Sequence, residues 1–125
     1  MEKSFIDSII GHLTTISTMA TLEDAANTKK LTKALINYLK YKTGRENQIV
    51  KLTEEIKYVS DLIYVYQVRN ENLLECHISI DEECRNIYIP HFTLMSIVEN
   101  SLIHAFGKVE SKWLISIKVE NGEEY

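Results

Sequence analysis

The polar residues best suited to chemistry lie close together in an otherwise apolar segment near residue 100. On a helix, the segment Ile97-Val-Glu-Asn-Ser-Leu-Ile-His104 would place Glu99 beside Asn100, with His104 one turn further along from Asn100. A carboxamide oxygen can bind Mg²⁺, and a neighbouring carboxylate can hold a water or accept a proton. The segment therefore suits a Mg²⁺-nucleotide. The plainer interpretation of the pattern alone is a helix with a few polar residues on its open face.

A second candidate, His12, lies on the first predicted helix, at the border between its apolar stripe and solvent. A phosphate acceptor needs such a position, because it must be reachable by another domain and still be held by packing. For His12 taken alone, the plainer alternative is a boundary histidine without a function.

The remaining histidines and the cysteines do not have the spacing of a known site. No Cys-x-x-Cys or His-x-x-x-His pattern could build a tetrahedral zinc site around Cys76, His77 and Cys84. We expect reduced thiols, a solvent-facing His77 on a strand, and His91 on the surface in the first turn of a helix. The sequence also contains no glycine-rich phosphate loop and no Gly-x-Ser-x-Gly elbow.

Composition excludes several classes of protein. A chain of 125 residues suffices for one compact domain or two half-sized units. Its 45% hydrophobic and 26% charged residues are typical of a soluble globular protein. The net charge of −4 provides no basic field for nucleic acid or an anionic membrane. No apolar run reaches the ~18 residues that span a bilayer, and the first ten residues are too polar for a signal peptide.

The first part of the chain has helical periodicity. Apolar residues from Phe5 to Ala20 form one broad stripe, and a similar pattern predicts a second helix from about Asp24 to Lys42. A third helix is predicted from about Leu52 to Arg69, with Thr53 as its N-cap. Its polar residues are expected to face water: Glu54, Glu55, Lys57 and Asp61.

After residue 70 the period changes to two. Leu74–Asp81 and Trp113–Val119 alternate as half-buried strands do, and Ile87–Ile89 predicts a short strand. Pro90 can open the next helix, from about His91 to Ala105, because its missing N–H is not needed in a first turn. The chain ends like a strand entering a turn whose returning strand is absent, so we expect a piece of a longer protein.

The segment from Pro90 to Gly107 resembles the N-box, the nucleotide-binding segment of LytS/YehU-type sensor histidine kinases, which typically contains Val-Glu-Asn-Ala-Ile-Lys-His-Gly. The resemblance covers nearly the whole chain. Residues 52–58, 66–69 and 74–81 follow that family's Leu-x-x-Glu-Leu helix start, Gln-x-x-Arg helix end and strand closing on an acidic turn. Upstream, residues 35–41 resemble its Leu-Leu-Arg-Tyr segment.

This resemblance implies an α+β fold. A helical dimerisation hairpin or bundle would be followed by an incomplete α/β-sandwich of the histidine-kinase ATPase type. On the family's template, residues 1–69 supply the helical dimerisation and phosphotransfer region. Residues 73–125 then supply the N-terminal half of a truncated ATPase domain.

The resemblance also implies roles for the candidate residues. His12 falls on the phosphoacceptor, Glu99 on the carboxylate that assists transfer, Asn100 on the Mg²⁺ ligand, and His104 on the nucleotide side. It implies that the parent protein uses ATP and Mg²⁺ and passes the phosphoryl group to the receiver domain of a response regulator. It further implies a homodimer and a cytoplasmic location, with any membrane segments elsewhere in the parent protein.

Two departures from the family favour a different function. Residues 10–16 lack the proline and both asparagines that surround the family's acceptor histidine, and Ile103 stands where the N-box usually carries lysine. The alternative is a non-catalytic dimerisation and signalling module, a degenerate kinase. The family's glycine-rich ATP boxes would follow Tyr125, so we expect this chain on its own to be inactive in either case.

Overall fold

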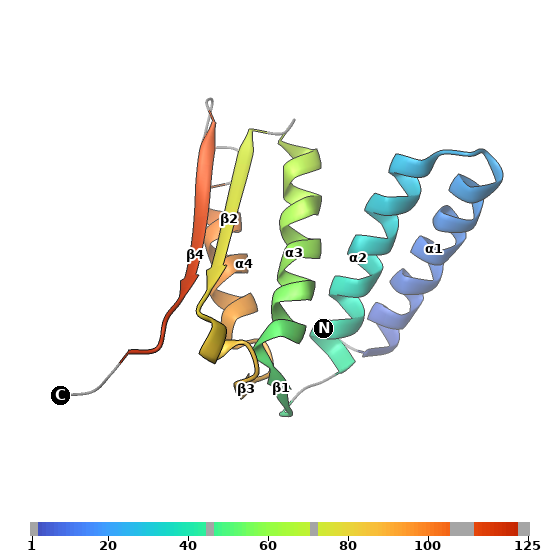
Figure 1. The fold of residues 1–125 in the computed structure, drawn as a ribbon. Helices are drawn as coiled ribbons and strands as arrows, with labels where there is room; N and C mark the ends of the chain where they lie inside the picture. Colours follow the sequence, from blue (N-terminus) through green and yellow to red (C-terminus); the bar gives the residue numbers. More distant parts are fainter. Residues whose placement is uncertain (1–2, 45–46, 71–72, 106–111, 123–125) are drawn as a thin grey trace.

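The computed structural model describes residues 3–44, 47–70, 73–105 and 112–122 as a set of helices and two small sheets (Figure 1). The α+β class expected from the sequence is confirmed. The described elements are α1 (Lys3–Leu22), α2 (Ala26–Gly44), β1 (Ile49–Lys51), α3 (Leu52–Arg69), β2 (Leu74–Ile80), the 3₁₀ turn η1 (Glu82–Cys84), β3 (Tyr88–Pro90), α4 (Thr93–Ala105) and β4 (Trp113–Val119).

The helices pack in sequence across the molecule. α1 packs against α2, α2 against α3, and α3 against both α4 and β2. Figure 1 shows the α1–α2 hairpin at one side, α3 in the middle, and α4 with the β2–β4 sheet at the other side. Because α2 lies between α1 and the rest, the first helix contacts the molecule mainly through α2.

The larger sheet pairs β2 and β4 in parallel, in register from Leu74↔Trp113 to Ile80↔Val119. Parallel neighbours need a crossover connection, and here α4 lies within it. The smaller sheet pairs β1 with β3 in antiparallel fashion, with Ile49 opposite Pro90. Pro90 therefore ends a strand. The prediction that it opens the next helix is wrong, because α4 begins three residues later, at Thr93.

The main core lies between α2, α3, α4 and the inner face of the β2–β4 sheet. Its buried apolar residues are Tyr38, Tyr41, Val50, Val59, Leu62, Ile63, Leu74, Met95, Val98, Leu102 and Ile117. α3 spans the predicted residues, but its N-cap is Lys51 and not Thr53. The largest departure from the predicted pattern is Glu55, which was expected to face water and is fully buried.

Helix α1 is covered on one side only. Ile6 and Ala20 are buried, whereas Phe5, Ile16 and Met19 keep about half of their surface exposed (53%, 48% and 50%). The broad apolar stripe predicted for this helix is thus only partly covered by α2. No helix of the described residues is long and apolar enough to cross a membrane.

The predicted division into residues 1–69 and 73–125 stays a prediction. α3 lies on the first side of that division and packs against α2, but also against α4 and β2 on the second side. The β1–β3 pairing likewise joins residues from both sides. In this arrangement α3 connects the helical hairpin to the sheet.

Candidate functional site

The start of α4 is fixed by Glu55, a buried carboxylate from α3. Its oxygens accept hydrogen bonds from the backbone N–H groups of Phe92 (2.7 Å), Leu94 (2.6 Å) and Met95 (2.9 Å), and from the hydroxyl of Tyr41. The first N–H groups of a helix have no partners within it, and the helix dipole favours a negative charge there. Glu55 therefore sets where α4 begins and in which direction it runs.

The backbone entering α4 is strained at Phe92, which has a φ of 73°. This left-handed conformation is costly for a residue with a Cβ, by roughly 1–2 kcal/mol. The hydrogen bond from the Phe92 N–H to Glu55 secures it. A signal for this role was present in the sequence: Glu55 lies three residues after Leu52 and four before Val59, on the same helix face as these buried residues.

The end of α2 contacts the segment that leads into α4 through Tyr41 and His91. The ring of Tyr41 stacks on that of Tyr58 with centroids 4.3 Å apart, and the backbone carbonyl of Tyr41 lies 2.6 Å from Nε2 of His91. Burial, with a further contribution from Glu55, raises the pKa of Tyr41 above its usual range, so its hydroxyl remains a donor. His91 is therefore half-buried and bonded, where the sequence had suggested a surface residue.

Two of the predicted site residues, Glu99 and Asn100, line one hollow on the outer side of α4. This α4 hollow has a volume of ≈ 510 Å³ and is lined by Ser96, Ile97, Glu99, Asn100, Ser101 and Ile103. The side chain of Asn100 is exposed and that of Glu99 is half-buried. His104 is exposed in the last turn of α4 and does not line the hollow.

Glu99 also reaches α2. Its Oε2 accepts a hydrogen bond from the hydroxyl of Tyr38, and Nζ of Lys42 lies 3.5 Å from the same oxygen. Burial raises the pKa of Glu99 above its ordinary value. Glu99 lies on α4 beside Asn100, and its carboxylate is bonded to α2 of the helical hairpin.

The structure does not bring His12 to these residues. His12 is exposed on α1, with Nε2 3.5 Å from Oγ of Ser8. α2 lies between α1 and the part of the molecule that contains α4 (Figure 1). In this arrangement His12 and Asn100 are on separate parts of the same chain.

A sequence model of the family described as histidine kinase matches residues 9–74, which is more than half of the chain. The chain belongs to the histidine kinase family. The matched residues include His12 and Glu55 and end at the first residue of β2, before α4.

Curated relatives confirm the resemblance to LytS-type sensor histidine kinases. Sensor protein LytS of Staphylococcus epidermidis is 30% identical over 82 residues, which cover 66% of this chain and 14% of that protein. Sensor histidine kinase BtsS of Escherichia coli K12 is 28% identical over 86 residues, or 69% of this chain and 15% of that protein. Sensor protein LytS of Staphylococcus haemolyticus is 25% identical over 113 residues, which cover 90% of this chain and 19% of that protein. The chain thus spans less than a fifth of each relative.

The α4 hollow of this histidine kinase chain fits part of a Mg²⁺-nucleotide site. Among the described residues, no group of three or more His, Cys, Asp or Glu side chains could hold a metal by itself. Mg²⁺ usually takes few protein oxygens together with waters and substrate phosphates. The oxygens of Asn100 and Glu99 match this donor chemistry, whereas Ile103, which is 58% exposed in the same hollow, offers the phosphates no charge.

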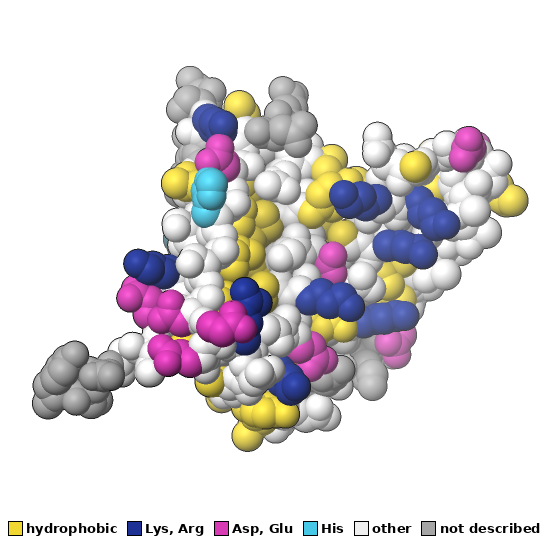
Figure 2. Space-filling model, in the orientation of Figure 1, with side chains coloured by type: hydrophobic (Ala, Val, Ile, Leu, Met, Phe, Trp, Pro, Cys, Tyr) yellow, Lys and Arg dark blue, Asp and Glu magenta, His cyan; other side chains and the backbone are white. Residues whose placement is uncertain are grey.

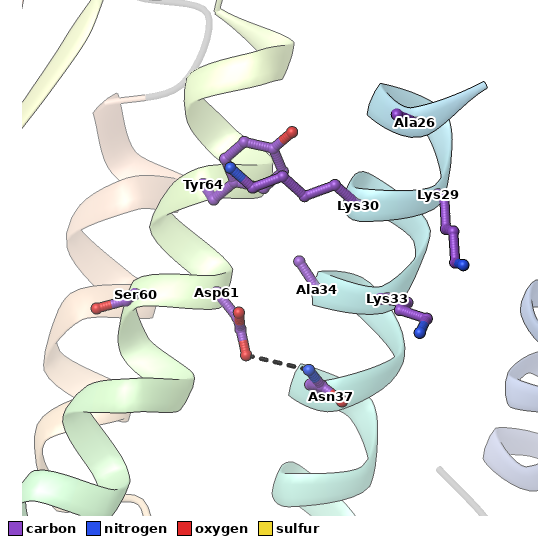
Figure 3. A pocket seen from close by; sticks show the side chains of 9 residues that line it. All are labelled: Ala26, Lys29, Lys30, Lys33, Ala34, Asn37, Ser60, Asp61 and Tyr64. Atoms are coloured by element: carbon purple, nitrogen blue, oxygen red, sulfur yellow. Dashed lines mark hydrogen bonds between the residues drawn. The ribbon is translucent and has the colours of Figure 1, made fainter. Parts of the chain in front are cut away.

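A second hollow, of ≈ 580 Å³, lies between α2 and α3 (Figure 3). Lys29, Lys30 and Lys33 line it, and Nζ of Lys30 lies 4.5 Å from the ring centroid of Tyr64. Burial raises the pKa of Asp61, which faces Asn37 across this hollow. None of the predicted site residues lines it. Figure 2 shows Lys and Arg side chains gathered over α2 on this face.

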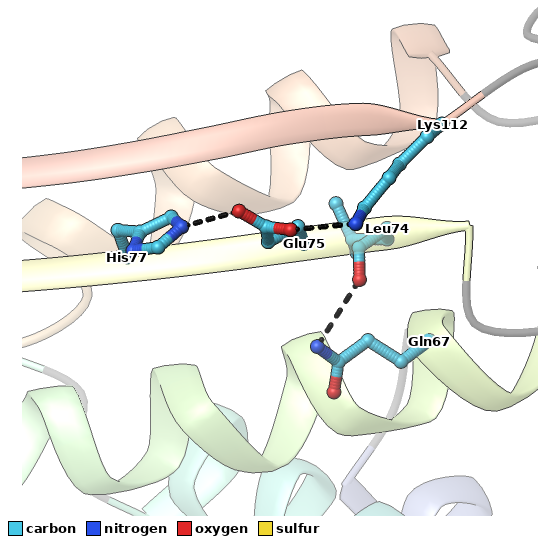
Figure 4. A network of polar contacts seen from close by, with 5 residues as sticks. All are labelled: Gln67, Leu74, Glu75, His77 and Lys112. Atoms are coloured by element: carbon cyan, nitrogen blue, oxygen red, sulfur yellow. Dashed lines mark hydrogen bonds and ion pairs between the residues drawn. The ribbon is translucent and has the colours of Figure 1, made fainter.

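A surface cluster links the starts of β2 and β4 (Figure 4). The carboxylate of Glu75 pairs with Nζ of Lys112 at 2.8 Å and with the ring of His77. Lys112 first and His77 second lower the pKa of Glu75 to about 2. His77 is exposed on the strand, as predicted, and the cluster lies away from the α4 hollow.

Proposed function

We propose that this chain is the region of a sensor histidine kinase that contains the phosphoacceptor helices and the first half of an ATPase-type α/β-sandwich. In the parent protein, ATP bound beside α4 would phosphorylate His12, and the phosphoryl group would pass to an aspartate on a response-regulator receiver domain. The observation that carries this proposal is the shared hollow of Glu99 and Asn100, where the N-box resemblance expects the nucleotide.

Each residue of the α4 hollow has a distinct proposed role. Mg²⁺, when bound, neutralises phosphate charge. The Asn100 carboxamide would hold the metal, Glu99 would accept a proton or orient the attacking group, and His104 would lie on the nucleotide side. Phosphoryl transfer depends mainly on positioning and charge neutralisation. The half of the site that this chain contains should therefore give almost no rate by itself.

The positions of His12 and Asn100 require a rearrangement or a second chain. α2 lies between their helices, so either the sheet-containing half moves, or His12 of one protomer is reached by the site of its partner. We propose a homodimer formed through α1 and α2, because α1 leaves part of its apolar stripe uncovered. We also place this region in the cytoplasm, with any membrane segments elsewhere in the parent protein.

The experiment that tests this function measures phosphate incorporation from labelled ATP into the full-length kinase. His12→Gln should abolish labelling, because His12 is the one histidine of α1. His77→Gln is the matched control, since this exposed histidine lies on β2 and should leave labelling unchanged. Full labelling of the His12→Gln protein would refute the assignment of His12.

A non-catalytic signalling module is the second candidate. The exposed Ile103 in the α4 hollow favours it, because the lysine usual in the N-box would contact phosphate there. The altered residues around His12 point the same way. This candidate predicts that the full-length protein associates with itself but incorporates no phosphate even with His12 intact.

A further inference from the structure

We propose that Tyr38 and Lys42 of α2 form a releasable latch on Glu99, which withholds this carboxylate from phosphotransfer until α2 shifts. The functional half of the proposal rests on the role proposed above for Glu99. The contact itself does not depend on that role, and it can be tested without ATP.

The latch consists of donors one helical turn apart on α2. The hydroxyl of Tyr38 donates to Oε2 of Glu99, Nζ of Lys42 lies 3.5 Å from the same oxygen, and Nζ of Lys42 is 3.3 Å from the Tyr38 hydroxyl. Residues at this spacing share one helix face. The face of α2 that contains Tyr38 and Lys42 therefore contacts the side chain of Glu99 on α4.

The contact has the exposure expected of one that can open. The side chain of Lys42 is 45% exposed and that of Glu99 is 20% exposed. Ion pairs near water are screened and contribute little to stability, so a modest force on α2 could separate them. Nζ of Lys42 also lies 5.7 Å from the ring centroid of Phe92, which gives the ammonium an alternative partner after release.

Buried contacts of Tyr41 with Glu55 and His91, which we call the joint, lie next to the latch. One turn beyond Tyr38, Tyr41 is 3% exposed and donates to the fully buried Glu55, while its carbonyl is bonded to His91. These buried contacts would be costly to break. A rotation of α2 about this joint would separate Tyr38 from Glu99 and leave the start of α4 in place.

In the arrangement with Glu99 bonded to α2, phosphotransfer to His12 of the same chain is not possible. α2 separates the helix of His12 from the helix of Glu99, so Glu99 cannot serve His12 of its own chain here. Oε2 of Glu99 already accepts a hydrogen bond from the Tyr38 hydroxyl and faces Nζ of Lys42, so it is not available to another group. Release of the latch should therefore activate Glu99.

The contact is tested in this chain by a double-mutant cycle. Tyr38→Phe removes one hydroxyl, and Glu99→Gln removes the charge. We expect their effects on the unfolding constant, measured in urea by circular dichroism, to deviate from additivity by ~5-fold or more. The cycle of Lys42→Met with Glu99→Gln should deviate in the same direction. Tyr64→Phe, which alters the hollow between α2 and α3 and not the contacts of Glu99 with α2, should be additive with Glu99→Gln. Additivity in both the Tyr38 and the Lys42 cycles would overturn the latch.

The withholding is tested in the full-length kinase. Tyr38→Phe and Lys42→Met should raise the initial autophosphorylation rate severalfold at saturating ATP without a change in KM for ATP. Lys40→Met, on an exposed lysine of the same helix, should leave the rate unchanged. An unchanged or lower rate for Tyr38→Phe would overturn the withholding. Full activity of Glu99→Gln, with the coupling intact, would instead refute the catalytic role proposed for Glu99.

Discussion

Glu55 of α3 accepts a hydrogen bond from the backbone N–H of Met95, forty residues further along the chain, at the start of the helix that contains Asn100. A single carboxylate thus connects the Leu-x-x-Glu-Leu segment to the N-box segment. The direction of α4, and with it the position of the α4 hollow, depends on a side chain outside that helix.

Replacing Glu55 by glutamine should lower the free energy of unfolding by about 2–4 kcal/mol, because an amide nitrogen would face the N–H donors of α4 in a buried site. Urea denaturation of this chain measures the change. Lys57→Gln, at an exposed position of the same helix, should stay within about 0.5 kcal/mol of the parent sequence. Equal stability of the Glu55 and Lys57 variants would contradict the capping role.

Glu55 also shows where reasoning from the sequence fails. The bounds of α3 and β4 match the predicted residues, because each follows from a repeat of apolar residues that is visible within the segment itself. The hydrogen-bond partners of Glu55 and the pairing of Pro90 with Ile49 lie about forty residues away along the chain, and no local period reveals them. Glu99 and Asn100 could be proposed as site residues because their motif is local, whereas the contact of Glu99 with Tyr38 was not predicted.

Asn100→Ala should abolish autophosphorylation in the full-length kinase. The neighbouring Glu99 projects about 100° away around the helix and is bonded to α2, so its oxygens cannot replace the lost carboxamide. Labelling with ATP measures the loss. Ser101→Ala is the control, because it alters the same hollow without removing an amide oxygen. If the Asn100→Ala kinase is labelled normally, the metal is held elsewhere.

The stability of this chain should fall in acid through Glu75. Its pKa in the folded protein is lowered to about 2, so folding favours the ionised carboxylate. The resulting stabilisation is fully present above the ordinary pKa of a glutamate and is lost as pH falls from there toward 2. Urea denaturation between these limits should show a flatter pH profile for Glu75→Gln. Since Glu75 and Lys112 are exposed, added salt should reduce the difference between the two proteins.

The control for this pH dependence is Glu83→Gln, which alters an exposed carboxylate of η1 away from Lys112 and His77. Glu83→Gln should leave the dependence of stability on pH close to that of the unmodified chain. A Glu75→Gln profile as steep as that of the parent sequence would show that the ion pair with Lys112 does not persist in solution.

The chain should self-associate through α1, most simply as a two-fold dimer. Phe5, Ile16 and Met19 keep about half of their surface exposed on a helix that packs mainly against α2. Burying a large apolar side chain contributes roughly 1.5–3 kcal/mol, so several such residues on one face favour association. A two-fold axis covers the same patch on both protomers at once. Analytical ultracentrifugation at tens of micromolar should detect the dimer.

The variant that tests this interface is Ile16→Asp, because Ile16 is 48% exposed and its replacement need not disturb packing against α2. A charge in a buried interface is costly, so Ile16→Asp should shift the chain to monomer. Thr15→Asp introduces the same charge at a neighbouring exposed position, on a polar side chain, and should leave the dimer intact. If the unmodified chain sediments as a monomer, the predicted dimer is wrong. If the Ile16→Asp protein still dimerises, the dimer contact lies away from this stripe.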